Sequence, residues 1–302
     1  MGGAKDLLKQ RWLQHRAGPS RGASVTAVRE ALRHAERLSG GADYNEASAP
    51  VFLLAVSWRT GSTLLQRVLM TDPSLFIWGE PWGRMSLFPR LADAVCAIDA
   101  EWPREKHLVT NLEADPTKDF VAANLFPPGT DFRAALRDFL VRWFEPAAAE
   151  RGFTRWGFKE VRLGAAEALV LRWLFPHAKF VVLLRHPYDA YRSCKDWTLY
   201  DRWPDRVVNS AASFARHWNR LALSWQEVRE DLDPVVLKYE DLVADGFDFR
   251  GLESRLGLKL DESAALGSRV GGTKNKQELT REEKRVVAEE AREGMRAYDY
   301  PA

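Results

Sequence analysis

A short segment between an apolar run and a helix-like run carries the residue types that bind anions. It reads Arg59-Thr60-Gly61-Ser62-Thr63 and follows the apolar residues 51–57. Small residues let an anion approach the backbone closely, hydroxyls add donors, and a helix start offers N–H groups without intrahelical partners. We expect a phosphate-type group here, with Arg59 supplying a full positive charge. A plain strand-to-helix turn has a similar composition, so the segment alone leaves both interpretations open.

The same segment lacks the lysine with which nucleotide hydrolases hold a triphosphate. In their phosphate-binding loop a Lys follows the last Gly, whereas here Ser62 follows Gly61. A P-loop kinase-like phosphotransferase is therefore an alternative that lacks a diagnostic residue. The loop favours a ligand with one phosphate-like group at this point and no magnesium-bound triphosphate.

A second pair of phosphate-binding side chains lies farther along the chain. Arg185 ends the apolar run KFVVLLR, and Ser193 follows eight residues later, within a helix predicted to begin near Pro187. A guanidinium and a hydroxyl suit a phosphate monoester, because the guanidinium donates two parallel hydrogen bonds.

The two motifs, in this order and in these strand contexts, resemble the sulfotransferase family. The resemblance implies a P-loop-like three-layer α/β fold and 3′-phosphoadenosine-5′-phosphosulfate (PAPS) as co-substrate, with no metal required. It implies that residues 57–63 bind the 5′-phosphosulfate and that Arg185 and Ser193 bind the 3′-phosphate. The segment LKYEDLV (237–243) resembles a family segment whose strand supports the nucleotide side.

A Gly- and Lys-rich segment near the C-terminus supplies further candidates for the 3′-phosphate. Cytosolic family members close over that phosphate with an Arg-Lys-Gly loop, which VGGTKNKQE (270–278) does not contain. Thr273 and Lys274 are the predicted contacts, and a solvated loop is the alternative.

Sulfonate transfer also requires a general base that removes the acceptor's proton. Glu80 ends the segment LFIWGE and precedes Pro81, where carbohydrate-type and bacterial members of the resembled family use a Glu base. A structural carboxylate paired with an arginine is the alternative for Glu80, and Glu160 and His107 are the other candidate bases. Lys159 is predicted to stabilise the leaving phosphate or bridging oxygen, the alternative being a salt bridge.

Apolar runs alternate with helical periodicity along most of the chain, which indicates an α/β fold with a central, mostly parallel sheet flanked by helices. Short apolar runs predict strands at 51–57, 75–80, 155–161 and 179–185, and another that begins at 234. Helices are predicted over 165–175 and 210–230, and after a capping box of Thr280 and Glu283. We expect a basic helical extension over residues 1–48 and a single domain over 49–302.

The composition narrows the class of partner. The 302-residue chain carries a net charge of +2, which favours neither nucleic acid nor a membrane surface. Its apolar stretches are shorter than the ~20 residues that span a bilayer, its start lacks the apolar core of a signal peptide, and its two cysteines are far apart. We therefore expect a cytoplasmic protein.

The acceptor is predicted to be a small molecule, a glycan or a natural product, and residues 83–150, which should cover it, do not distinguish these. A non-catalytic nucleotide-binding or docking module of the same fold remains an alternative, with the basic N-terminus as its docking element. The oligomeric state is open.

Overall fold

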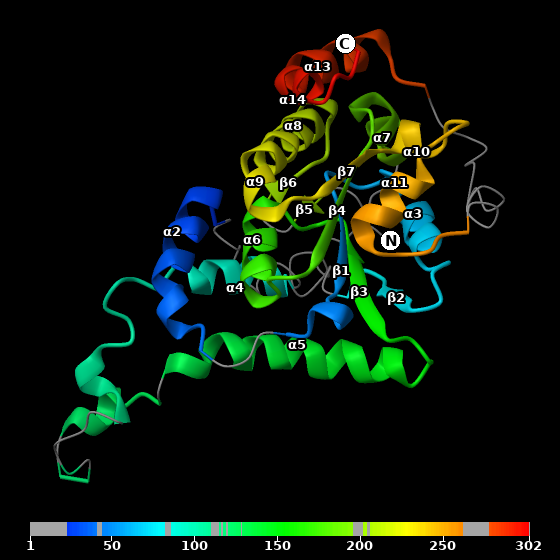
Figure 1. Ribbon diagram of the computed structural model, residues 1–302. Helices are drawn as coiled ribbons and strands as arrows, with labels where there is room; N and C mark the ends of the chain where they lie inside the picture. Colours follow the sequence, from blue (N-terminus) through cyan, green and yellow to red (C-terminus); the bar gives the residue numbers. More distant parts are fainter. Residues whose placement is uncertain are drawn as a thin grey trace, which may run out of the picture.

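A five-stranded parallel sheet forms the centre of the computed structural model (Figure 1). Its strands, in the order in which they lie side by side, are β2 (Leu75–Trp78), β3 (Arg155–Glu160), β1 (Val51–Ala55), β4 (Lys179–Leu184) and β7 (Val235–Lys238). The four neighbouring pairs are all parallel. The predicted α/β fold is confirmed, and so is each predicted strand. The structure describes residues 23–40, 44–81, 86–109, 115, 117–118, 120–127, 129–195, 202–203, 206–261 and 278–301.

Helices cover both faces of the sheet and make the fold three-layered. In chain order they are α2 (Val25–Ala35), α3 (Ser62–Leu69), α4 (Leu87–Val95), α5 (Phe132–Ala149), α6 (Ala165–Leu174), α7 (Pro187–Cys194), α8 (Ala211–Glu227), α9 (Arg229–Leu232), α10 (Tyr239–Leu242), α11 (Phe249–Leu256), α13 (Arg281–Glu290) and α14 (Arg292–Ala297). Short 3-10 turns and a small ribbon of β5 (Arg202–Trp203) and β6 (Arg206–Val207) complete the described part. Helices α6 and α8 lie on one side of the sheet, and α3 and α11 on the other (Figure 1).

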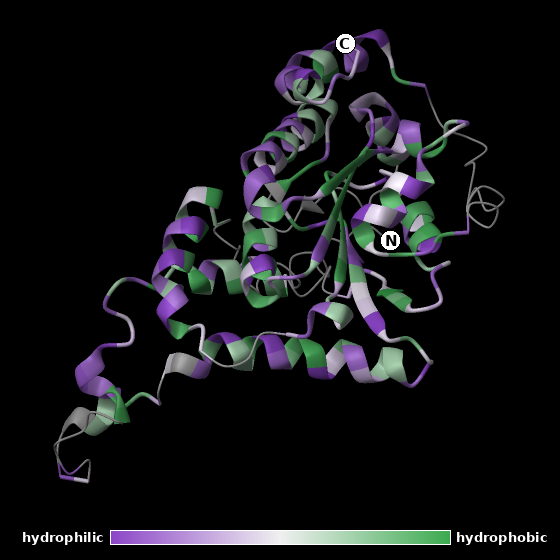
Figure 2. Ribbon diagram, viewed as in Figure 1, coloured by the Kyte–Doolittle hydropathy of each residue, from purple (hydrophilic) through white to green (hydrophobic). Residues whose placement is uncertain are grey.

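Alternating side chains of the strands feed two separate cores. Phe52 and Leu54 of β1 belong to the larger core, with residues of α2, α4, α5, α6 and α8. Val51 and Leu53 belong to the smaller core, with residues of α3 and α11. Because successive residues of a strand point to opposite faces, a strand buried on both faces is a continuous apolar run, as the sequence predicted. Figure 2 shows these strands as the hydrophobic centre of the molecule.

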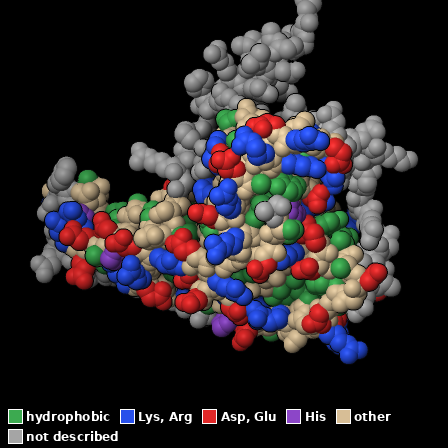
Figure 3. Space-filling view, turned by 90° about the horizontal axis from the view of Figure 1, so that it is seen from above, with side chains coloured by type: hydrophobic (Ala, Val, Ile, Leu, Met, Phe, Trp, Pro, Cys, Tyr) green, Lys and Arg blue, Asp and Glu red, His purple; other side chains and the backbone are tan. Residues whose placement is uncertain are grey.

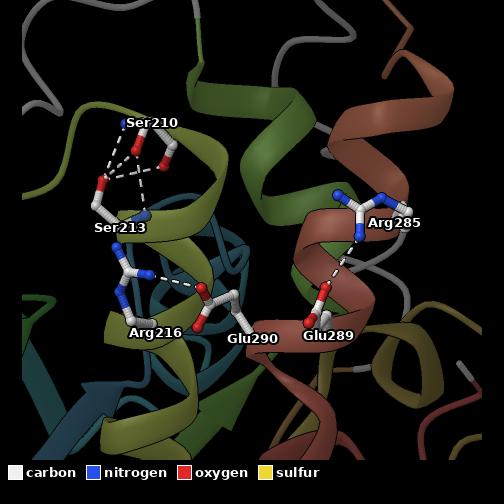
Figure 4. Close-up of polar contacts among 6 residues, drawn as sticks. All are labelled: Ser210, Ser213, Arg216, Arg285, Glu289 and Glu290. Atoms are coloured by element: carbon white, nitrogen blue, oxygen red, sulfur yellow. Dashed lines mark hydrogen bonds and ion pairs between the residues drawn. The ribbon is translucent and has the colours of Figure 1, made fainter.

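Helix α8 joins the C-terminal helices to the sheet. The helix predicted over 210–230 is confirmed, and its apolar stripe is buried in the larger core, with Phe214, Trp218, Leu221 and Trp225. Ser210 caps the helix by accepting a hydrogen bond from the Ser213 backbone at 3.2 Å (Figure 4). Arg216 of α8 pairs with Glu290 of α13 at 2.5 Å, as Figure 4 shows. The predicted capping box of Thr280 and Glu283 is confirmed at the start of α13.

Helix α2 packs on α6 and α4. Val28 and Ala35 are fully buried in the larger core, so this helix shares its core with the sheet. The expected division of the chain at residue 48 stays a prediction. In the described part of the chain, no helix has the length and apolarity that crossing a membrane requires.

Candidate active site

The candidate residues gather at one edge of the sheet. Parallel strands bring all their carboxyl ends to the same edge, where ligands bind in open α/β folds. Glu80 follows β2, Lys159 lies near the end of β3, the loop 56–61 follows β1, Arg185 follows β4 and Tyr239 follows β7. The strand order therefore places the Glu80 end and the Arg185 end on opposite sides of the β1 loop. Lys and Arg side chains are interspersed with Asp and Glu on the face seen in Figure 3.

The loop between β1 and α3 has the backbone shape of an anion site. Arg59 (φ 61°) and Gly61 (φ 90°) both adopt the left-handed conformation, and Gly61 is the residue that caps α3. Such turns aim successive backbone N–H groups into one concave space. Leu64 and Leu65 both donate to the Gly61 carbonyl, which leaves the N–H groups of Ser62 and Thr63, before them in the first turn, available to an anion.

A buried hydroxyl in this loop has no hydrogen-bond partner among the described residues. Thr60 is fully buried, and its Oγ1 makes no hydrogen bond within the described structure. Buried hydroxyls without a partner are rare because losing water without replacement is costly. Because Thr60 has no exposed surface, a ligand would reach its hydroxyl only if the loop opened. The backbone N–H groups at the start of α3 and the charge of Arg59 are what suit this loop chemically to the phosphosulfate of PAPS.

Arg59 links the two phosphate motifs. Its Nε donates a hydrogen bond to Ser193 Oγ at 3.1 Å, and its carbonyl accepts one from Arg185 Nη1 at 3.0 Å. The sequence paired Arg185 with Ser193, whereas in the structure both residues are hydrogen-bonded to Arg59. Arg185 and Ser193 follow Arg59 in the sequence by 126 and 134 positions, and these hydrogen bonds hold both of them at the loop after β1.

The residues that follow β7, Tyr239 and Glu240, pack against the loop after β1 and against the residues that follow β4. The Arg185 guanidinium lies 4.4 Å from the centre of the Tyr239 ring, and the same ring packs on Gly61. Glu240 Oε1 accepts a hydrogen bond from the His186 backbone at 2.9 Å, and its Oε2 accepts one from the Tyr300 hydroxyl at 3.1 Å. The sequence indicated that residues 237–243 support the nucleotide side, but it gave no signal for these side-chain contacts.

At the opposite end of the edge, Glu80 lies between two cations. Its Oε1 is 2.5 Å from Lys159 Nζ, and its Oε2 is 2.9 Å from Arg162 Nη1. The Lys159 side chain is 7% exposed, whereas that of Glu80 is 31% exposed and therefore within reach of a ligand. Both structural alternatives are therefore present, because Glu80 pairs with an arginine, Arg162, and Lys159 forms its salt bridge with Glu80. Arg162, which the sequence analysis did not single out, completes this cluster.

Glu160 is a buried carboxyl group behind that cluster. It is 1% exposed, and its Oε1 accepts backbone hydrogen bonds from Val161 and Arg162. Its Oε2 has no hydrogen-bond partner among the residues that the structure describes. Burial, together with the nearby charge of Glu80, raises the pKa of Glu160 from 4.5 to about 7. A carboxyl group without exposed surface cannot touch an acceptor unless the site opens.

The other candidates lie elsewhere or outside the described residues. His107 belongs to a 3-10 turn, Glu105–His107, in a segment that extends to the lower left of Figure 1, away from the carboxyl edge. Thr273 and Lys274 lie outside the described residues. Among the residues that are described, no group of three or more His, Cys, Asp or Glu side chains is arranged to hold a metal ion.

The fold and this edge define an α/β protein with a phosphate-type loop between its first strand and the following helix. The chain belongs to the sulfotransferase family, because a profile of that family matches residues 50–262. No curated protein was found to match the chain.

Three solved structures are similar at low sequence identity. A sulfotransferase domain from the curacin biosynthetic pathway is 16% identical, with a TM-score of 0.48, over 86% of this chain and 99% of that one. Sulfotransferase STF9 from Mycobacterium avium is 15% identical, with a TM-score of 0.44, over 91% and 82% of the two chains. Sulfotransferase STF1 from Mycobacterium tuberculosis H37Rv is 17% identical, with a TM-score of 0.40, over 96% and 93%.

Proposed function

We propose that this sulfotransferase-family chain transfers a sulfonate group from PAPS to a hydroxyl or amine acceptor. The observation that carries the proposal is the joining of the two phosphate motifs by Arg59, which bonds to Ser193 and to Arg185. One ligand with an anionic group at each end would span from the β1 loop to the end of β4. PAPS has this pattern of charge, with a phosphosulfate at one end and a 3′-phosphate on the ribose.

Within this proposal, Glu80 is the general base. Lys159 and Arg162 hold its two oxygens, so one oxygen must exchange a cation for the acceptor's hydroxyl before it takes the proton. Its partial exposure supports Glu80 over Glu160, which is buried, and the position of the 105–107 turn argues against His107. The acceptor oxygen then bonds to sulfur while the bond between sulfur and the bridging oxygen breaks, and adenosine 3′,5′-bisphosphate leaves.

Lys159 has two tasks in this scheme. Its ammonium group orients the Glu80 carboxylate before the reaction. During the reaction the same ammonium group turns toward the negative charge that develops on the departing phosphate. β2 and β1 are two strand spacings apart, about 10 Å, which leaves room for an acceptor and a sulfonate between Glu80 and the β1 loop.

The test is transfer from radiolabelled PAPS to a panel of hydroxyl compounds, alongside calorimetric binding of adenosine 3′,5′-bisphosphate. Glu80→Gln should lower kcat by about 100- to 10,000-fold, the usual contribution of a general base, and leave bisphosphate binding unchanged. Glu289→Gln, on the exposed face of α13, is the matched control and should behave as wild type. Magnesium-dependent turnover of ATP without bisphosphate binding would instead support the phosphotransferase alternative. Transfer by Glu80→Gln at the wild-type rate would remove the base assignment.

A further inference from the structure

The two cations that bind the Glu80 carboxylate are held in different ways. Lys159 lies within β3, where its backbone is in register with Leu53 of β1, and its side chain is 7% exposed. Arg162 follows the end of β3, outside the sheet, and its side chain is 22% exposed. Arg162 is therefore the cation on the solvent side of the carboxylate, the side from which a hydroxyl group approaches.

The backbone that carries Arg162 is fixed by a buried carboxyl group. Glu160 Oε1 accepts hydrogen bonds from the backbone N–H groups of Val161, at 2.9 Å, and of Arg162, at 3.2 Å. These bonds bend the chain directly after β3, and the bend directs the Arg162 side chain to the end of β2, the neighbouring strand. Glu160 is 1% exposed, so the bend is anchored in the interior. Arg162 thus combines a fixed backbone with a side chain that reaches solvent.

The two ion pairs differ in how readily they open. A partly exposed ion pair contributes little to stability, because water solvates both charges when the pair opens, whereas a buried charge that loses its partner is strongly destabilising. The contact between Arg162 Nη1 and Glu80 Oε2, at 2.9 Å, is the more exposed of the two. An incoming hydroxyl group therefore displaces Arg162 from Oε2 and leaves the buried Lys159 on Oε1.

We propose that Arg162 is a positioning residue that keeps Glu80 from activating water when no acceptor is bound. Its guanidinium group occupies Oε2 until the acceptor's hydroxyl displaces it. A bound acceptor offsets the broken ion pair with its other contacts, whereas a water molecule has no further contacts to offer. The ion pair therefore selects for a bound acceptor over water. The inference rests on the proposed function, because it uses PAPS as the donor and Glu80 as the base.

Loss of Arg162 should allow water to take the acceptor's place. One proton of the water passes to the Glu80 carboxylate, the water oxygen bonds to the sulfonate sulfur, and the bond between sulfur and the bridging oxygen breaks. The products are adenosine 3′,5′-bisphosphate and hydrogen sulfate, which releases its remaining proton to solvent. The donor is then consumed without any acceptor.

The test measures the release of inorganic sulfate from PAPS labelled on sulfur, with no acceptor present. Arg162→Gln should raise this release at least fivefold over wild type, while the affinity for adenosine 3′,5′-bisphosphate, measured by calorimetry, stays within twofold. Arg162→Lys keeps a cation at this position and should restore most of the protection. Combining Arg162→Gln with Glu80→Gln should return the release to the wild-type level or below, because the base that water uses is then gone.

A matched control and a second variant make the result specific. Arg255→Gln breaks an ion pair of the same length, 2.9 Å from Arg255 Nη2 to Asp233 Oδ1, beside the start of β7 at the opposite edge of the sheet, and should behave as wild type. Arg162→Met removes the charge but keeps an unbranched side chain, and it replaces Arg162→Gln if that variant does not bind the bisphosphate. Unchanged sulfate release in a variant that binds the bisphosphate, or a rise that persists in the double variant, would overturn the inference. A wild-type protein that binds no bisphosphate would instead contradict the proposed function.

Discussion

The ring of Tyr239 lies directly against Gly61, so that a Cβ atom added to Gly61 would be 2.2 Å from Tyr239 Cδ2. The same ring carries the Arg185 guanidinium, at 4.4 Å from its centre. Tyr239 therefore fixes the distance between the loop after β1 and the arginine after β4. Gly61 is required there both for its positive φ and for the space that its missing side chain leaves.

Gly61→Ala should impair binding and folding together. The left-handed backbone disfavours alanine by about 1 kcal/mol, and the clash with Tyr239 adds to it, so we expect a loss of about 2 kcal/mol or more in unfolding free energy. Adenosine 3′,5′-bisphosphate affinity should fall with it. Gly152→Ala is the matched control, because Gly152 has a similar φ of 86° with no atom within 4 Å of an added Cβ. Equal losses in the two variants, measured by urea denaturation, would show that the Tyr239 contact is unimportant.

Arg185→Ala should weaken adenosine 3′,5′-bisphosphate binding by about 2–3 kcal/mol, the range for lost hydrogen bonds to charged groups. Arg185→Lys should recover little of this, because a lysine cannot donate to the Arg59 carbonyl and a phosphate with the same fork geometry. Calorimetric titration measures both variants. Arg216→Ala removes an exposed arginine that pairs with Glu290 on the C-terminal helices, and its affinity should match wild type. An unchanged affinity in Arg185→Ala would eliminate the 3′-phosphate role.

The C-terminal tyrosine should act on donor binding from a distance. Tyr300 donates to Glu240, and Glu240 holds the His186 backbone next to Arg185. Tyr300→Phe should therefore cost about 1–2 kcal/mol of stability and also weaken bisphosphate binding several-fold. Tyr298→Phe deletes an equally buried hydroxyl, whose partner is the Ala222 carbonyl of α8, and should lower stability alone. If the two variants bind the bisphosphate equally well, Tyr300 has only a structural role.

Glu160 should make the protein less stable as the pH rises. Burial and the charge of Glu80 raise its folded pKa to about 7 from 4.5, so between these values the native state holds a proton that the unfolded chain releases. The stabilising contribution is complete below pH 4.5 and is lost as the pH rises through 7. Relative to wild type, Glu160→Gln should gain roughly 2–3 kcal/mol between pH 5 and pH 8. Urea denaturation at the two pH values measures this, and a constant difference between wild type and variant would contradict the raised pKa.

The sequence predicted the fold in outline because its strongest signals are local. Continuous apolar runs such as 180–184 are typical of strands buried on both faces, and helical periodicity between them indicates parallel strands with helical crossovers. The capping box at Thr280 and the stripe of α8 are likewise set by residues three or four positions apart. The anion-type loop was visible for the same reason, since its small residues are consecutive.

The relationships across the sheet edge were decided by the tertiary structure. Arg59 bonds to Ser193 across 134 positions, and Glu80 meets Lys159 across 79, distances over which residue spacing holds no information. The strand order determines which of these groups become neighbours, and no local pattern encodes that order. Tertiary packing also decides that Glu160 is buried while the nearby Glu80 remains partly exposed. The sequence by itself determined which chemical groups the chain carries and which elements hold them, and packing of the sheet decided which groups act together.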